Sequence, residues 1–220
     1  MTAYFITATG TDCGKTFITA ALLAAARARG LSAHAYKPVM SGWRAEDTAS
    51  DAHLLRAAGG NQQSLDALSY YRFAAPLSPH QAAAKEGTTI DWEQLVGWCR
   101  THVATATPQS PCYLEGAGGV MTPITTTRTM RDLAAALAIP VILVSGTALG
   151  SISHTLTAIE ALRAVNVPIH ALILNESAGS TIPLAEAHTA IAPFVRSIPH
   201  CLVQPRVASL TQAESFAALL

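Results

Sequence analysis

Charged side chains are scarce in this sequence. Only 13% of its 220 residues are Asp, Glu, Lys or Arg, about half of the usual ~25%. So few charged side chains leave part of the surface apolar, and we expect another chain to bury that part. We therefore predict a homo-oligomer. The 14 basic and 14 acidic residues cancel, and the basic ones form no cluster. Proteins bind nucleic acids through clustered basic side chains that contact the phosphates, so we expect no nucleic-acid partner.

Cysteine pairs are also missing. The four cysteines are far apart, and none belongs to a CxxC motif: Cys13, Cys99, Cys112 and Cys201. This spacing argues against a zinc knuckle and against a dense disulfide framework. Free thiols are typical of a reducing cytosol, so we expect a cytoplasmic protein.

Neither a signal peptide nor a membrane span is predicted. The opening MTAYFITATG has no basic residue ahead of its apolar run, unlike a signal peptide. The uncharged segment 133–159 exceeds the ~20 residues needed to cross a bilayer, but Pro140, Gly146 and Gly150 interrupt it. A helix, a buried strand and a polar glycine loop explain the segment better, and we expect no membrane association.

Short apolar runs alternate with alanine-rich segments of helical character. The runs that we predict to be strands are 4–8, 34–39, 112–114, 141–145 and 169–174. The strongest helix predictions are 16–29, 91–105 and 153–165, the first of them ended by Gly30. Helix-length connections between buried strands give a parallel sheet. The sequence therefore predicts one α/β domain over 1–220, with helices on both faces of a mostly parallel sheet and ligands at the carboxyl ends of its strands.

The segment ITATGTDCGKT, residues 6–16, places a glycine-containing turn between a predicted strand and a predicted helix. This is the context of a phosphate-binding loop, in which backbone N–H groups and the helix amino terminus surround the phosphates. In such a loop Lys15 contacts the β- and γ-phosphates, Thr16 coordinates Mg²⁺, and Gly14 permits close backbone approach. The strict pattern GxxxxGK[ST] is not met, because Thr9 occupies the position of its first glycine. A helix start that happens to contain GKT is the alternative, but the flanking strand and helix favour nucleotide binding.

A second glycine-rich segment, CYLEGAGG (112–119), ends an apolar strand with Glu115. Alone, it would be a solvated acid in a glycine turn. A carboxylate at the carboxyl end of a strand, beside a phosphate loop, is suited to hold Mg²⁺ or its water. The two segments together therefore predict a metal-nucleotide site.

Three other segments have ordinary structural explanations. Lys37 ends a predicted strand, where an isolated lysine is usually solvated. Ser50 and Asp51 open SDAHLLRAAG as a helix cap and a first-turn acid, and Ser78-Pro79 opens another helix. Residue type and spacing alone predict no function for them.

Taken in order, the motifs resemble those of the dethiobiotin synthetases. The shared segments are GTDCGKT, KPVMSG, SDA, PLSPHQAAAKEG, EGAGG, PVILVSGTALGSISHT and LILN, and the resemblance extends from residue 3 to about residue 200. KPVxSG, PxSPHxAA and EGAGG in this order are shared by few other phosphate-loop enzymes. The resemblance implies the three-layer fold of P-loop NTPases.

The resemblance also implies a reaction, the ATP- and Mg²⁺-dependent ring closure of biotin biosynthesis. 7,8-Diaminopelargonate and CO₂ form a carbamate, ATP phosphorylates it to a carbamic-phosphoric anhydride, and the second amine closes the ring, giving dethiobiotin, ADP and phosphate. The carbamate and the γ-phosphate repel each other, so phosphoryl transfer needs cations between them. The anhydride must also be kept from water.

Roles for individual residues follow from the same resemblance. Lys15 and Lys37 are expected to be catalytic, and Thr16, Asp51 and Glu115 to hold Mg²⁺. The expected ATP contacts are Asp12, Cys13, Gly14, Lys15, Thr16, Phe17, Glu115, Gly116, Ala117 and Gly118, with Asn175 at the adenine and the backbone of Pro199, His200 and Cys201 near the base. The expected substrate contacts are Thr11, Lys37 and Ser41 and, from the second subunit of a homodimer, Gly150, Ser151 and Ser153.

The sequence departs from the family at Ala8, Asp12 and Ser153, and the last of these concerns the contacts of the substrate carboxylate rather than the reaction. Three alternative functions are consistent with a phosphate loop. A partition or division-site ATPase would carry a lysine where Gly10 stands. A cobyrinic-acid-type synthetase would need an added glutaminase domain, for which 220 residues leave no room. A nucleotide sensor without chemistry stays open as an alternative.

Overall fold

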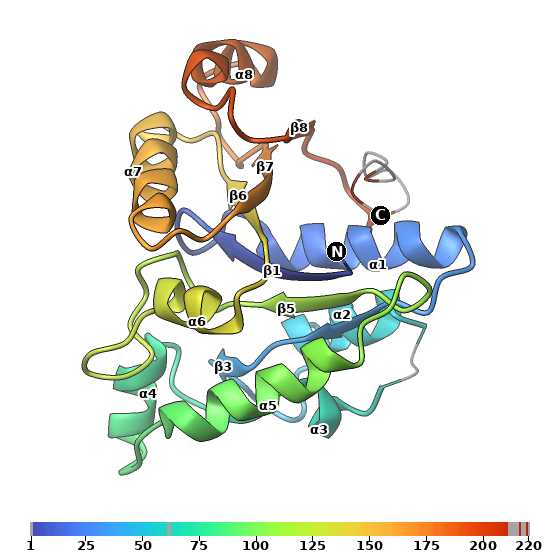
Figure 1. Cartoon of the computed structure of the whole chain (residues 1–220), viewed down its shortest axis with the longest axis vertical. Helices are drawn as coiled ribbons and strands as arrows, with labels where there is room; N and C mark the ends of the chain where they lie inside the picture. The colour runs from blue at the N-terminus through green and yellow to red at the C-terminus, as the bar shows by residue number, and fades with distance from the viewer. Residues whose placement is uncertain (1, 61–62, 211–215, 217–218, 220) are drawn as a thin grey trace.

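The computed structural model describes residues 2–60, 63–210, 216 and 219. Within these residues, six parallel strands form the central sheet in the order β2-β5-β1-β6-β7-β8 (Figure 1). Their bounds are β1 Ala3–Ala8, β2 His34–Tyr36, β5 Cys112–Glu115, β6 Val141–Ser145, β7 Ile169–Asn175 and β8 His200–Gln204. Two short parallel strands, β3 (Val39–Ser41) and β4 (Tyr71–Phe73), pair with each other. The predicted parallel α/β sheet is confirmed.

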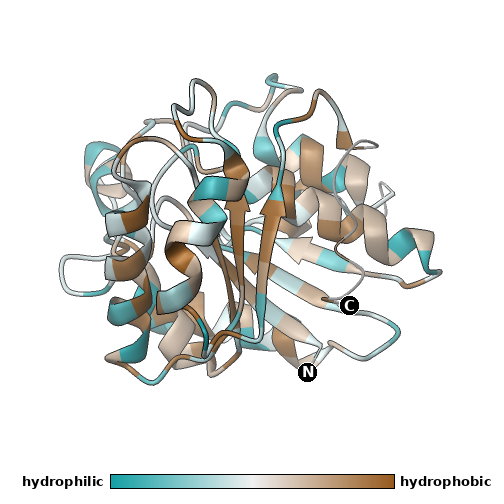
Figure 2. Cartoon of the chain, turned by 90° about the horizontal axis from the view of Figure 1, so that it is seen from above, coloured by the Kyte–Doolittle hydropathy of each residue, from teal (hydrophilic) through white to brown (hydrophobic). Residues whose placement is uncertain are grey.

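Helices cover both faces of this sheet. One face packs against α1 (Lys15–Ala28) and α2 (Asp51–Ala58). The other packs against α5 (Trp92–Ala104), α6 (Met130–Leu137) and α7 (Ser151–Arg163). The remaining helices are α3 Leu65–Leu68, α4 Pro79–Lys85, α8 Leu184–Ile191 and the 3₁₀ helix η1 Ala192–Phe194. In Figure 2 the hydrophobic strands run through the middle, and most hydrophilic residues lie on the surrounding helices and loops.

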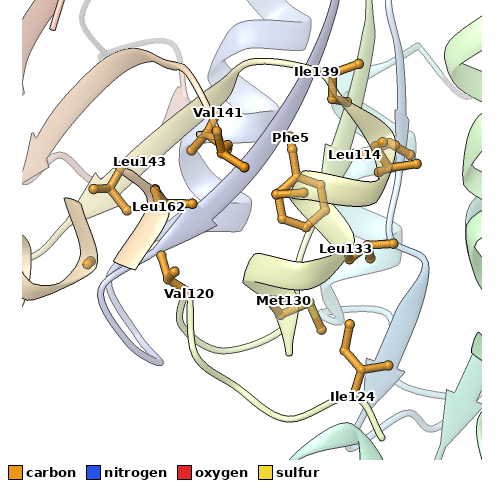
Figure 3. Close-up of a cluster of buried hydrophobic side chains, with 14 of the residues drawn as sticks. Phe5, Leu114, Val120, Ile124, Met130, Leu133, Ile139, Val141, Leu143 and Leu162 are labelled. Atoms are coloured by element: carbon orange, nitrogen blue, oxygen red, sulfur yellow. The ribbon is translucent and has the colours of Figure 1, made fainter. Parts of the chain in front are cut away.

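Each buried strand contributes side chains to both layers. Phe5 of β1 belongs to the cluster under α5, α6 and α7, whereas the next residue, Ile6, belongs to the cluster under α1 and α2. Figure 3 shows Phe5 next to Leu114 of β5, with Leu133 of α6 nearby. Because successive strand residues face opposite sides, a strand covered on both faces must be apolar throughout. This explains the uninterrupted apolar runs of the sequence.

The predicted helices and strands agree with the structure to within about two residues at each end, with one exception. The run 34–39, predicted as one strand, is divided between β2 and β3. Pro38 has no N–H group to donate to a sheet, and the Lys37 N–H donates instead to the Leu68 carbonyl oxygen, 2.8 Å away. The chain therefore leaves the main sheet at Lys37.

The uncharged segment 133–159 is divided as the sequence predicts. It contains most of α6, all of β6, a loop over 146–150 and the first part of α7. None of the helices in the described residues has both the length and the apolar character needed to cross a bilayer.

Truncation of a core leucine tests this packing. Leu143 of β6 is fully buried between the sheet and its helices, so we expect Leu143→Ala to lower the free energy of unfolding by about 2–5 kcal/mol. Met121→Ala is the control, because 48% of that residue is exposed, and we expect it to cost less than about 1 kcal/mol. Urea unfolding followed by circular dichroism measures both, and equal losses would contradict the assigned burial.

Candidate active site

The order and register of the strands bring three segments to one edge of the sheet. The phosphate loop follows β1, Glu115 ends β5, and Lys37 follows β2. β5 lies between β1 and β2, with Glu115 paired to Ile6 and Leu114 paired to Tyr36. Since parallel strands end at the same edge, the phosphate loop, the acid and the second lysine meet there.

The phosphate loop is compact. Lys15, the first residue of α1, donates from Nζ to the Gly10 carbonyl oxygen over 3.2 Å and so folds back over the loop. On the other side Gly119 lies against the loop backbone, where a Cβ on Gly119 would be 3.1 Å from the Gly10 nitrogen. A larger residue at position 119 would crowd the loop backbone, which explains the last glycine of EGAGG. The role of Glu115 at a metal site does not explain that glycine.

Lys37 is the centre of a buried charge cluster. Only 6% of the residue is exposed, and its ammonium forms ion pairs with Asp51 Oδ2 and with Glu115 Oε1, the latter at 2.9 Å. Glu115 is fully buried, and its Oε1 also accepts a hydrogen bond of 2.7 Å from the Thr16 hydroxyl. The interpretation of Lys37 as a solvated lysine, drawn from residue type alone, is therefore wrong. Its partners come from α2 and β5, which the local sequence does not contain.

Opposing effects set the charges of this cluster. Burial alone would lower the pKa of the Lys37 ammonium, but Glu115 and Asp51 outweigh it and hold that pKa above its ordinary value. Burial likewise would raise the pKa of Asp51, yet the nearby Lys37 lowers it. For Lys15, burial lowers the pKa against the attraction of Glu115. At neutral pH the Lys37–Asp51 pair is thus fully ionised.

The three predicted magnesium ligands lie together around this cluster. Glu115 accepts from Thr16 and Lys37 through Oε1, while its buried Oε2 has no hydrogen-bond partner among the described residues. Asp51 forms an ion pair with the same Lys37 ammonium. Mg²⁺ takes oxygen ligands and keeps several from water and phosphate, so one hydroxyl and two carboxylates suit it. No cluster of three His, Cys, Asp or Glu side chains that could hold a metal occurs in the part of the chain that the structure describes.

A cleft of about 890 Å³ opens beside this cluster. The predicted site residues that line it are Thr11, Asp12, Gly14, Lys15, Thr16, Phe17, Lys37, Ser41, Asp51, Ala117 and Gly118. The buried Ser41 Oγ has no partner among the described residues, so it is able to bond a ligand. One wall is apolar, formed by Met40, Trp43 and Leu77. Sequence reasoning missed this wall, because isolated apolar side chains carry no chemical signature.

The residues expected from a second subunit lie elsewhere. Gly150, Ser151 and Ser153 are not among the residues that line the large cleft. Ser151 borders a smaller hollow of about 400 Å³ on the other side of the phosphate loop, together with Cys13 and Leu149. In one subunit the structure therefore does not bring these residues to Lys37.

The expected adenine contacts are separated. Asn175 ends β7 at the phosphate-loop edge, and its Nδ2 donates to the Cys13 carbonyl oxygen over 3.0 Å. Pro199, His200 and Cys201 lie at the start of β8 instead, since the register pairs His200 with Ala171 and Gln204 with Asn175. At ~3.3 Å per residue, His200 lies about 13 Å from the site edge. The strand continues to Gln204, so the segment near the edge is 204–206.

Solved structures show a related fold. A ParA family ATPase from Chlorobium tepidum superposes with a TM-score of 0.52 at 12% identity, covering 99% of this chain and 92% of that one. At this identity the likeness concerns the fold alone. A family model described as an AAA domain matches residues 2–215.

Curated relatives are much closer in sequence. The ATP-dependent dethiobiotin synthetase of Methylobacterium nodulans is 42% identical over 199 residues, covering 87% of this chain and 88% of the relative. The synthetase of Phenylobacterium zucineum is 46% identical over 189 residues, with 83% and 80% covered. That of Anaeromyxobacter dehalogenans is 38% identical over 216 residues, with 97% and 95% covered. The chain therefore belongs to the family of ATP-dependent dethiobiotin synthetases.

Proposed function

We propose that this chain, acting as a single domain, converts 7,8-diaminopelargonate, CO₂ and ATP to dethiobiotin, ADP and phosphate. The observation that carries the proposal is the buried Lys37, held by Asp51 and Glu115 beside a phosphate loop in a cleft large enough for two substrates. Membership of the dethiobiotin synthetase family supports the same reaction.

The two lysines supply the charge that the reaction needs. Lys15 contacts the β- and γ-phosphates, and Lys37, a stable ammonium in this environment, faces the carbamate and the transferring phosphoryl group. Thr16, Asp51 and Glu115 hold Mg²⁺, which when bound neutralises charge on the phosphates. Two of the three lysines in the chain line this one cleft, so the positive charge is concentrated where two anions must meet.

The cleft also suits the diamine. Ser41 offers a hydroxyl to its polar end, and Met40, Trp43 and Leu77 offer an apolar surface to its methylene chain. The nucleotide base contacts Asn175 and, in place of residues 199–201, residues 204–206 at the carboxyl end of β8. The mixed anhydride must be kept from water until the ring closes.

A homodimer in the cytoplasm completes the proposal. Leu149 is the most exposed large apolar residue described, and it precedes the Gly150 expected to reach the partner's site. The low charge of the whole chain supports a covered surface.

The reaction itself is the direct test. The purified protein is incubated with ATP, Mg²⁺, bicarbonate and 7,8-diaminopelargonate, and ADP and the product mass are followed. We expect ADP release that depends on the diamine and stops on chelation of the metal. Nucleotide binding without diamine-stimulated turnover would favour the sensor without chemistry.

Removal of the phosphate-loop charge should abolish activity. We expect Lys15→Ala to lose turnover and most of its ATP affinity, because backbone dipoles alone cannot replace a point charge at the β- and γ-phosphates. Titration calorimetry and ADP release measure the two effects. Lys85→Ala, at the exposed end of α4, is the matched control. Turnover by Lys15→Ala at the parent rate would refute the phosphate-loop assignment.

Lys37 should act mainly in the transition state. We expect Lys37→Gln to lower kcat by a factor on the order of 10² or more, while ATP binding falls less than in Lys15→Ala. Because the substitution leaves two carboxylates without their cation, thermal unfolding is compared first, and Lys37→Arg serves as a charge-preserving control. A kcat within about threefold of the parent would place Lys37 outside the chemistry.

The dimer prediction is tested by mass in solution. We expect sedimentation at micromolar concentration to give twice the chain mass, because Gly150, Ser151 and Ser153 reach a diamine only from a second subunit. A fully active monomer at the same concentration would contradict a shared site.

A further inference from the structure

The phosphate loop is attached to a strand that is not adjacent to its own. Asn175 ends β7, and β6 lies between β7 and β1. The Asn175 side chain nevertheless donates a hydrogen bond from Nδ2 to the backbone oxygen of Cys13, with 3.0 Å between the two atoms. The contact joins residues 162 positions apart, so only the folded chain contains it.

The same amide packs directly against Gly14. That glycine has φ +88°, in the left-handed region, and a Cβ built on it would lie 2.1 Å from Asn175 Nδ2. Both the backbone conformation and the occupied space therefore require glycine. Close approach to phosphate was the only reason that the sequence offered for Gly14, and the packing of Asn175 is a second one.

The hydrogen bond also fixes the direction of a phosphate-binding N–H group. The peptide between Cys13 and Gly14 is planar and trans, since no cis peptide occurs in the described residues. In such a peptide the C=O and N–H bonds point in opposite directions. Because the Cys13 oxygen is turned toward Asn175, the Gly14 N–H is turned away from β7. Phosphate loops bind anions through such N–H groups, and donors fixed before binding need no reorganisation.

We propose that Asn175 is a positioning residue for the phosphate loop, whose amide holds the Cys13–Gly14 peptide with the Gly14 N–H facing the bound phosphates. The proposal rests on the proposed nucleotide site and goes beyond the base contact that the family resemblance assigns to Asn175. The two roles are compatible, because Nδ2 holds the loop while Oδ1 makes no hydrogen bond among the described residues.

Inorganic tripolyphosphate separates the two roles, because it has the phosphates of ATP and no base. We expect Asn175→Ala to weaken the binding of both ATP and tripolyphosphate about tenfold, as measured by calorimetry with Mg²⁺. Amide hydrogen exchange of residues 9–15 should also become faster in the unliganded variant. A variant that binds tripolyphosphate as the parent does, with unchanged exchange in the loop, would overturn the proposal and leave Asn175 as a base contact.

Ser180→Ala is the matched control. The Ser180 hydroxyl lies in the loop after β7 and shares its hydrogen bond between the carbonyl oxygens of Ile182 and of Thr147, which lies in the loop after β6. The substitution therefore removes hydrogen bonds near the same edge without removing a contact to the phosphate loop. We expect unchanged binding of both ligands, and a loss equal to that of Asn175→Ala would also overturn the proposal. A parent that binds neither ligand would instead refute the nucleotide site, and loop exchange would still test Asn175.

Discussion

The ion pairs of Lys37 are the interaction on which the site depends. They join the segment after β2 to α2 and β5, through residues 14 and 78 positions apart. Lys37 and Glu115 are buried, whereas 48% of the Asp51 side chain is exposed. Removing such charges from water costs several kcal/mol per ion, and the cost is offset only when partners and hydrogen bonds are well placed. The cluster is therefore stable only if three separate segments are positioned together, and positioning them also assembles the site.

The parallel sheet provides that positioning. β5 follows β1 by about a hundred residues, yet it lies between β1 and β2, so Glu115 has the phosphate loop on one side and Lys37 on the other. Glu115 then accepts from Thr16 and Lys37 with a single oxygen, and its second oxygen has no hydrogen-bond partner among the described residues. Buried apolar strands determine the order of the sheet, and that order determines which charges meet.

The phosphate loop is held at several points at once. Lys15 folds over it, Gly119 approaches its backbone, and Asn175 reaches it from β7. A loop of this kind binds anions through backbone dipoles that must point the right way before the ligand arrives. The segments after β5 and β7 thus serve the nucleotide site by limiting the conformations of a loop that follows β1.

The sequence by itself determined the features that depend on neighbouring residues. Apolar runs, alanine-rich helices and the Gly14-Lys15-Thr16 turn are local patterns, and they predict the layers of the fold and the phosphate loop with boundaries close to those observed. Lys37 shows where such inference ends. Its type and position alone predict a solvated lysine, and only the motif resemblance placed it in the site.

The tertiary structure decided what depends on residues distant in the chain. The charge of Lys37 depends on Asp51 and Glu115. The pairing of β8 with β7 places residue 204, and not residues 199–201, level with Asn175. The contact between Asn175 and Cys13 likewise exists only across an intervening strand. The physical reason is common to all three. The charge state of a buried lysine, the position where a strand ends and the partner of a side-chain amide all depend on groups that folding brings close in space. A single sequence does not show which groups those are.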